Sequence, residues 1–335
     1  MTRPVTFSVR VGGHGVWSVV DKARAAEEAG FDQVWTGNDF LGEPGLVTLA
    51  AIALRTERIR FGSGVLDPVT LHPGQLATYA SGLQEVSGGR FLLGIGAGSE
   101  VFFARAGVEP AKPAVRTREA VVAVRELLAG RSPAGVPGAA PGWTPQAVLR
   151  DPHPTPVYVG GMGPRMLDLT GRLADGALPL CLPPRHVHHA VAQIAAGAEK
   201  AGRSIEDLDV AACVWASISE DRDTARRLLA RHIALYSGSL APAALVANGL
   251  DPEEFARTQA ILDTEGEEAA TDSVSEAMLE LGIVGSAEEV VERCAALVES
   301  GVRHLSFGPP LGPDPVASIR LLGERVLPVL RAQLG

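Results

Sequence analysis

IRFGSGVLDPVTLHP (Ile59–Pro73) is a strand-like run with a glycine-rich exit, and GRFLLGIGAGS (Gly89–Ser99) repeats this pattern one helical span later. Each run is apolar, as expected for a buried β-strand. Glycine permits positive φ and lets the backbone approach a ligand closely. Because the two exits belong to successive β/α units, we expect them to open onto one shared mouth, whose geometry suits a flat cofactor.

The composition is that of a globular protein with a sizeable core. Hydrophobic residues make up 46% of the 335 residues and charged residues 21%, close to the average of soluble domains. The net charge of −9 and the absence of a basic stripe argue against a nucleic-acid partner. The N-terminus lacks a signal-peptide pattern and no window is as long as a membrane span, so we expect a cytoplasmic protein without a membrane partner. Three widely spaced cysteines, Cys181, Cys213 and Cys294, argue against a disulfide framework.

Apolar β-branched runs alternate with alanine-rich helical patterns along the chain, which is typical of a parallel sheet built from β/α units. About eight such units favour an α/β fold closed into a (β/α)8 TIM barrel, although an open doubly wound sheet would show the same local pattern. We expect one domain over residues 1–335, with an irregular proline-rich insertion at 132–156 that covers the site and a partly helical insertion at 236–273. The predicted strands are Thr6–Val11, Gln33–Thr36, Ile59–Val65, Phe91–Ile95, Val157–Gly160, Gly176–Pro179, Val210–Ser217 and His304–Phe307.

Five segments resemble the luciferase-like flavin and deazaflavin oxidoreductases: GFDQVWTGNDF, GSGVLDPVTLHPGQLA, GGRFLLGIGAGS, PVYVGGMGPRMLDLTGRLADG and GVRHLSFGPPLGPDP. Within that superfamily, LDPVTLHP is most similar to the coenzyme F420-dependent branch typified by methylenetetrahydromethanopterin reductase. The resemblance implies a barrel that is usually a homodimer. It also implies a deazaflavin or flavin at the carboxyl-terminal ends of the strands.

The resemblance further implies a cis peptide bond between Gly64 and Val65, forming a bulge against which the cofactor ring packs, with Ser63 beside it. A cis bond without proline costs about 3–4 kcal/mol, so it persists only where the surrounding packing stabilises it. The alternative is an ordinary trans strand with a glycine at a bulge.

A second glycine-rich strand exit, VYVGGMGP, is the candidate phosphate site, because several backbone N–H groups there lead into a helix. Arg165 would add a charge near the same anion. The alternative is a tight β/α turn without a ligand. The cofactor-binding residues predicted in the two glycine-rich exits are Gly96, Ala97, Gly98, Gly160, Gly161, Met162, Gly163 and Arg165.

The family resemblance also identifies candidates for proton chemistry. The branch usually has an acid at the position of Ser99, whereas this chain has Glu100 one residue later, so both are catalytic candidates; Glu100 as a solvated loop carboxylate is the alternative. Asn38 and Asp39 stand where the branch commonly has an acid followed by histidine. Asn38 can hydrogen-bond the ring, and Asp39 supplies a carboxylate. We predict an ion pair between Asp39 and Arg10, which would give Asp39 a structural role.

The histidines suggest no metal site. His72 precedes Pro73, and a lone histidine there is expected to cap a helix or pack. His186 and His189 have i, i+3 spacing without a partnering carboxylate, which is typical of a solvated helical face.

The sequence therefore predicts an F420-dependent oxidoreductase that transfers hydride between C5 of the deazaflavin and a C=N or activated C=C bond of a small molecule. One alternative is an FMN-dependent monooxygenase of the same fold. Another is a barrel that has no cofactor and acts as a binding subunit.

Overall fold

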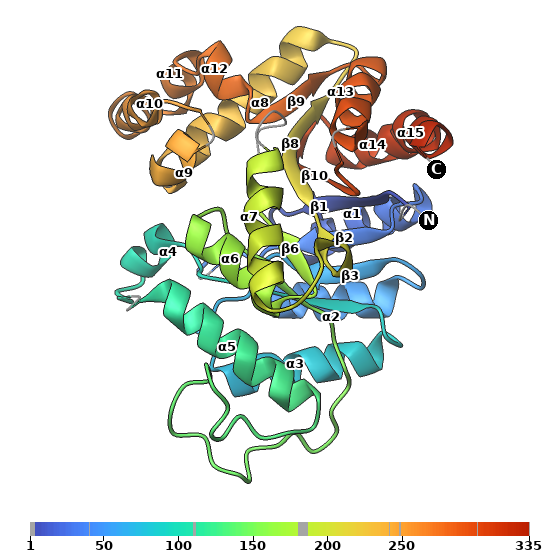
Figure 1. The fold of residues 1–335 in the computed structure, drawn as a ribbon. Helices are drawn as coiled ribbons and strands as arrows, with labels where there is room; N and C mark the ends of the chain where they lie inside the picture. Colours follow the sequence, from blue (N-terminus) through green and yellow to red (C-terminus); the bar gives the residue numbers. More distant parts are fainter. Residues whose placement is uncertain are drawn as a thin grey trace.

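The computed structural model describes residues 4–39, 41–109, 112–179, 187–240, 242–247, 249–299 and 301–334 (Figure 1). Strands and helices alternate along these residues, as the sequence predicted. Most strand residues are buried, which is expected of parallel strands covered on both faces. The strands are β1 (Thr6–Val11), β2 (Gln33–Thr36), β3 (Arg60–Ser63), β4 (Phe91–Gly96), β5 (Val157–Gly160), β6 (Gly176–Leu178), β7 (Asp209–Val210), β8 (Ala212–Ile218), β9 (Gly282–Gly285) and β10 (His304–Leu311).

The sheet closes into a barrel. Its order is β7-β6-β5-β4-β3-β2-β1-β10-β8-β9, and every pairing is parallel. β7 stands at one end of this order, and β8 stands near the other end, beside β10. The barrel closes there because β7 and β8 follow each other directly in the chain: Ala211, which lies between them, donates its N–H to the Ala177 carbonyl of β6 at 3.0 Å. This confirms the predicted α/β barrel. The predicted strand Val210–Ser217 is therefore divided between β7, which pairs with β6, and β8, which pairs with β10.

Two differences from the predicted strands arise at the carboxyl-terminal ends. The extra strand β9 pairs with the last half of β8 and was not predicted. The last strand, β10, continues past the predicted end at Phe307 to Leu311 and includes a cis bond between Pro309 and Pro310. Backbone irregularity thus concentrates at the ends of the strands, where the sequence pattern is weakest.

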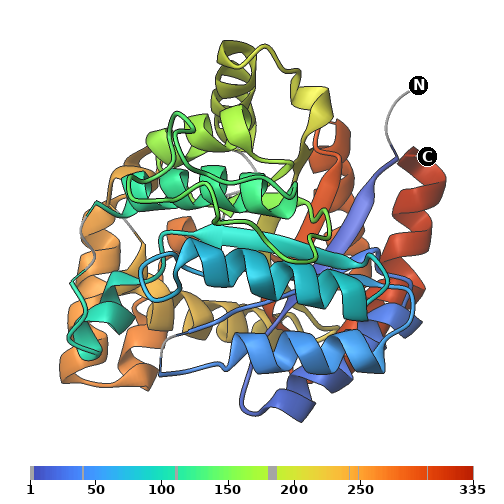
Figure 2. The ribbon, with the colours of Figure 1, turned by 90° about the horizontal axis from the view of Figure 1, so that it is seen from below.

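Amphipathic helices cover the outside of the barrel with their apolar faces inward, and α2 and α3 lie side by side over the strands (Figure 2). Proline occupies the first turn of several helices, where its missing N–H is not needed. No helix among the described residues is long and apolar enough to cross a membrane. The surrounding helices are α1 (Val16–Glu28), α2 (Gly45–Arg55), α3 (Pro73–Val86), α5 (Pro113–Leu128), α6 (Pro164–Leu173), α7 (Val187–Lys200), α13 (Ala287–Glu299), α14 (Pro315–Leu321) and α15 (Leu327–Leu334), the last two joined by a π-helical turn at Leu322–Val326.

The proline-rich segment 132–156 has turns but no helix or strand among its described residues. It lies along the outside of α3: the Trp143 ring packs on His72, and Gln84 donates to the Pro154 carbonyl at 3.2 Å. Figure 1 shows this loop at the bottom, beyond α3 and α5. Its backbone is held by these contacts, which the sequence pattern could not reveal.

The second insertion is helical and lies on the opposite side of the barrel (Figure 1). It follows α8 (Arg222–Tyr236), whose apolar face forms a separate core with Trp215, Phe255 and Met278. Exposed ion pairs such as that between Arg227 and Asp272 join α8 to the insertion. Its elements are the 3-10 turn Ser237–Ser239, α9 (Pro242–Ala247), α10 (Pro252–Thr264), α11 (Glu267–Asp272) and, beyond residue 273, α12 (Glu276–Leu279).

Candidate active site

The bond between Gly64 and Val65 is cis, as predicted. The β3–β4 ladder is interrupted there and resumes at Leu66, whose N–H donates to the Gly94 carbonyl at 2.9 Å. The buried hydroxyl of Ser63 fills the interruption, because it donates to the Gly94 carbonyl at 3.0 Å and accepts from the Gly94 N–H at 2.9 Å. Ser63 is fully buried, so its contribution to a site is to hold the bulge from behind.

The Val65 side chain fits between the ends of the next two strands. A Cβ added at Gly96 would lie 2.6 Å from Val65, and one added at Gly160 would lie 2.7 Å from it. Real side chains cannot approach so closely, so both positions need glycine. Two of the predicted cofactor-binding glycines therefore have a packing role, which is to seat the bulge.

Arg10 lies behind the bulge and donates from Nη2 to the Gly64 carbonyl at 2.9 Å. The predicted ion pair between Arg10 and Asp39 is wrong: within the described ranges, no ion pair joins the two side chains. The guanidinium is directed to a carbonyl of the cis bond, and it affects Asp39 only through its charge. We expected the ion pair because Arg10 and Asp39 lie near the ends of neighbouring strands, but the bulge places the Gly64 carbonyl within hydrogen-bonding distance of Arg10.

Two carboxyl groups meet in the loop after β2. Burial raises the pKa of Asp39, and the charge of Arg10 opposes this shift. Glu43, which the sequence analysis did not select, accepts from the Gly13 N–H at 2.6 Å; burial raises its pKa too, and Asp39 adds to the shift. The Asp39 N–H donates to the Glu43 carbonyl at 3.2 Å, so the loop returns upon itself. The signal in the sequence was an acid four residues after Asp39 in the same exit loop.

Asn38 lies between this loop and α2. Its side-chain oxygen accepts from the Gly45 N–H at 3.1 Å, which satisfies one of the free donors at the start of the helix. A Cβ at Gly45 would lie 2.5 Å from that of Asn38, so this close approach needs glycine. The Asn38 amide nitrogen has no protein partner in the part of the chain that the structure describes, and it remains able to donate to a ligand.

The buried residue Asp67 holds the loop after β3 and lies next to the loop after β4. Asp67 accepts from the N–H groups of Val69 and Thr70 at 2.9 and 2.7 Å. In the loop after β4, Ala97 and Ser99 are half-buried, and Gly98 is exposed with φ at 80°. A Cβ added at Gly98 would lie 3.1 Å from that of Asp67. The short helix α4 (Glu100–Arg105) follows, and the side chain of Glu100 lies outside the described residues.

The predicted phosphate cradle leads into α6. Gly160, Gly161, Met162 and Gly163 are half-buried, and Arg165 is exposed in the first turn. Gly163 is the N-cap; no side chain caps the helix, and a Cβ added at Gly163 would meet nothing within 4 Å. Pro164 has no N–H, and Met166 donates to the Gly163 carbonyl at 2.9 Å. Among the described residues, the Arg165 N–H in this first turn therefore has no protein partner and can donate to an anion.

Outside this region, His72 caps α3 by accepting from the Gly74 N–H at 3.1 Å, as predicted. His188 and His189 are exposed on α7, whereas His186 and Cys181 lie outside the described residues. Cys213 and Cys294 are buried free thiols. Among the described residues, Glu85, Asp151 and His153 form one group with ligand atoms within 4.8 Å, on the surface between α3 and segment 132–156.

The base of the barrel, formed by the amino-terminal ends of the strands, holds a buried polar cluster. Asp209 accepts from Tyr158 at 2.8 Å and Gln33 at 3.2 Å and pairs with His304 at 3.0 Å, while the other His304 nitrogen lies 2.7 Å from the Ser8 hydroxyl. Burial acts to raise the pKa of Asp209, but these partners hold it well below its usual range.

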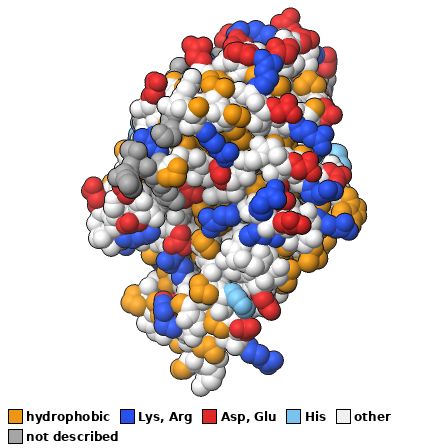
Figure 3. All heavy atoms as spheres, turned by 90° about the vertical axis from the view of Figure 1, so that its right-hand side faces the viewer, with side chains coloured by type: hydrophobic (Ala, Val, Ile, Leu, Met, Phe, Trp, Pro, Cys, Tyr) orange, Lys and Arg blue, Asp and Glu red, His pale blue; other side chains and the backbone are white. Residues whose placement is uncertain are grey.

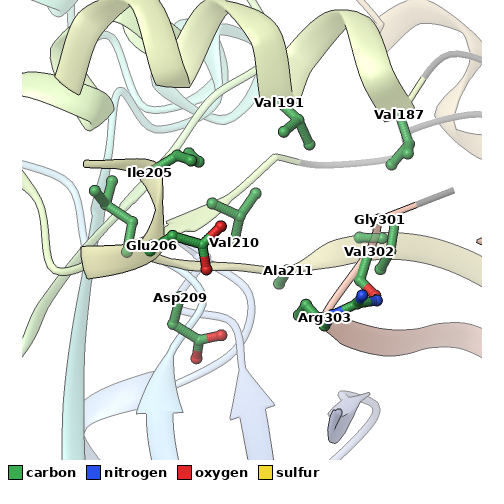
Figure 4. A pocket seen from close by; sticks show the side chains of 12 residues that line it. Val187, Val191, Ile205, Glu206, Asp209, Val210, Ala211, Gly301, Val302 and Arg303 are labelled. Atoms are coloured by element: carbon green, nitrogen blue, oxygen red, sulfur yellow. The ribbon is translucent and has the colours of Figure 1, made fainter. Parts of the chain in front are cut away.

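A cavity of about 70 Å³ adjoins this base, between α7, β7 and the segment before β10 (Figure 4). Mostly apolar side chains line it, and the carboxylate of Asp209 already has its partners. The face on the side of the two termini shows acidic and basic side chains interspersed, without a patch of one sign (Figure 3). The free polar groups described above lie at the other end, around the bulge.

The luciferase-like monooxygenase family model matches residues 6–304. The chain belongs to this family. A 5,10-methylenetetrahydromethanopterin reductase of Archaeoglobus fulgidus is 33% identical over 319 residues, which cover 92% of this chain and 94% of the relative. An F420-dependent glucose-6-phosphate dehydrogenase of Nakamurella multipartita is 29% identical over 99% of this chain and 98% of its own.

Luciferase-like structures also match the fold. The coenzyme F420-dependent tetrahydromethanopterin reductase of Methanopyrus kandleri superposes with a TM-score of 0.89 at 27% identity, covering 98% of this chain and 99% of that one. The match extends across the barrel and both insertions. Every element that forms the bulge and the α6 cradle thus lies within the shared fold.

Proposed function

We propose that this protein is a coenzyme F420-dependent oxidoreductase acting on a small molecule. The observation that carries the proposal is the likeness, over nearly the whole chain, to reductases and dehydrogenases named for F420. The cis bulge supports it, because the bulge offers a rigid platform at the carboxyl-terminal ends of barrel strands, where ligands of such barrels bind. When bound, the deazaflavin supplies or accepts a hydride at C5, and the protein supplies position and electrostatics.

The residues at the mouth fit such a group. Gly64 and Val65 would back the flat ring, and the free amide nitrogen of Asn38 would donate to a ring oxygen. The uncapped start of α6 would receive the phosphate, with Arg165 exposed beside it. Ser63 and Gly96 act from behind by holding the bulge and seating Val65. Ala97, Gly98 and the residues Gly160, Gly161 and Met162 would complete the walls with backbone.

Asp39, Ser99 and Glu100 are the proposed sources of a proton for the substrate. Asp39 is the most completely defined of the three, since burial raises its pKa and so favours the protonated form that a donor needs. The substrate would be an imine or an activated alkene, whose developing negative charge these groups would neutralise. We also propose a homodimer, which light scattering of the purified protein would test.

Titration of the apo protein with oxidised F420 and separately with FMN, followed by cofactor fluorescence, tests the proposed function. We expect F420 to bind at least tenfold more tightly than FMN. The reverse preference would favour a flavin-dependent monooxygenase, and binding of neither would favour a binding subunit without a cofactor.

A further inference from the structure

The cis bulge has a positive charge directly behind it. Arg10 Nη2 lies 2.9 Å from the Gly64 carbonyl oxygen. A Cβ added at Gly64 would lie 3.5 Å from Nη2 and 3.6 Å from Nη1, so the guanidinium packs against the peptide bond itself. The hydrogen bond and this contact fix the Arg10 side chain relative to the platform.

This charge is not neutralised by a close partner. Among the described residues, Arg10 forms no ion pair. Its charge acts to lower the pKa of Asp39 and of the buried Cys213 thiol, and in both groups burial has the larger, opposite effect. The charge of Asp39 acts on Glu43, and the Glu43 carboxylate accepts from the Gly13 N–H. A charge in a half-buried site with few counter-charges acts over several ångströms, because the local dielectric is low.

We propose that Arg10 is a positioning residue that holds the bulge and whose charge favours the reduced, anionic form of the bound cofactor. The inference rests on the proposed function. Accepting a hydride makes a deazaflavin ring one charge unit more negative, because two electrons arrive with one proton. A fixed guanidinium behind the ring platform therefore stabilises the reduced form more than the oxidised form. Asp39, at the same mouth, has the opposite effect whenever it is ionised.

The test compares dissociation constants for oxidised and reduced F420, measured anaerobically by fluorescence and absorbance. Arg10→Gln keeps a donor for the Gly64 carbonyl and removes the charge, and we expect it to weaken reduced F420 about tenfold more than oxidised F420. Arg10→Lys keeps the charge and should leave the ratio within about threefold of the wild-type ratio. Asp39→Asn should shift the ratio in the opposite direction at a pH at which Asp39 is ionised. Arg118→Gln, on the exposed face of α5, should not change it.

A ratio that is equal in wild type, Arg10→Gln and Asp39→Asn would overturn the inference while leaving the proposed function intact. Failure of the wild type to bind either form of F420 would overturn both. If Arg10→Gln does not fold, as judged by near-ultraviolet circular dichroism, Arg10→Met takes its place, because it also removes the charge while keeping a side chain of similar length.

Discussion

The two ends of the barrel differ in whether their polar groups have hydrogen-bond partners within the protein. At the base, the carboxylate of Asp209 is surrounded by Tyr158, Gln33 and His304 and needs nothing from a ligand. At the mouth, the Asn38 amide nitrogen and the Arg165 N–H in the first turn of α6 lack protein partners within the described structure. Groups that satisfy one another stabilise a fold, whereas free groups on rigid elements are available to bind. The comparison assigns stability to the base and ligand binding to the mouth.

Removing the centre of the base should have the largest effect. We expect Asp209→Ala to lower the free energy of unfolding by about 3–5 kcal/mol, because it leaves His304 and Tyr158 buried without their acceptor. The folded pKa of Asp209 is depressed, so its stabilisation is present above the unfolded pKa and is lost as the pH falls below about 4. Urea denaturation at several pH values should therefore show a flatter acid limb for the variant. The exposed Asp21→Asn is the control, with an effect within about 0.5 kcal/mol. An equal loss in both variants would contradict the assignment.

A buried group without a partner also exists beside the last half of β8. His232 packs between Trp215 and Tyr236, its Nε2 has no partner in the part of the chain described, and burial lowers its pKa to about 4. Between pH 6.5 and about 4 the unfolded chain binds a proton that the folded chain does not. Stability should therefore fall by up to about 3 kcal/mol over this range.

His232→Phe keeps the aromatic packing and should remove this part of the pH dependence, as measured by thermal or urea unfolding. His188→Gln, on the exposed face of α7, is the matched control and should leave the wild-type profile unchanged. An unaltered pH profile in His232→Phe would show that the ring is already free to take up a proton.

Disturbing the bulge should weaken cofactor binding as well as stability. Gly96→Ala and Gly160→Ala each force Val65 to move, so we expect F420 affinity to fall at least tenfold and stability by about 1–3 kcal/mol. Gly82→Ala in α3 is the control, because a Cβ there meets nothing within 4 Å. It should raise stability by about 0.5–1 kcal/mol without affecting affinity. Unchanged F420 affinity in Gly96→Ala and Gly160→Ala would show that the bulge is not part of the binding site.

The start of α6 permits a test that separates charge from folding. Gly163→Asp adds a good N-cap in open space, so the helix should be at least as stable as before. The added carboxylate should repel a phosphate and weaken F420 about tenfold, whereas the uncharged Gly163→Asn should bind nearly as well as the wild type. Equal affinity for both variants would place the phosphate elsewhere.

The sequence predicted the barrel better than it predicted the contacts within the mouth. Strands β1, β2 and β5 lie where the apolar runs place them, because burial on both faces gives a continuous signal. The strand β9 was not predicted because glycine at both of its ends leaves only Ile283 and Val284 as strand-forming residues. The partner of Arg10 and the role of Glu43 depend on how two loops return upon themselves, and single-chain patterns carry no record of such contacts.

Hydrogen–deuterium exchange of the protein with and without F420 tests most directly whether the ligand binds at the mouth of the barrel and not at its base. The account predicts slower exchange at the mouth, in residues 38–45, 64–67, 96–99 and 160–167, with no change at residues 208–210 and 301–304 around the base. Protection confined to the base cavity would contradict the account, because the ligand would then occupy the end at which the polar groups are already satisfied.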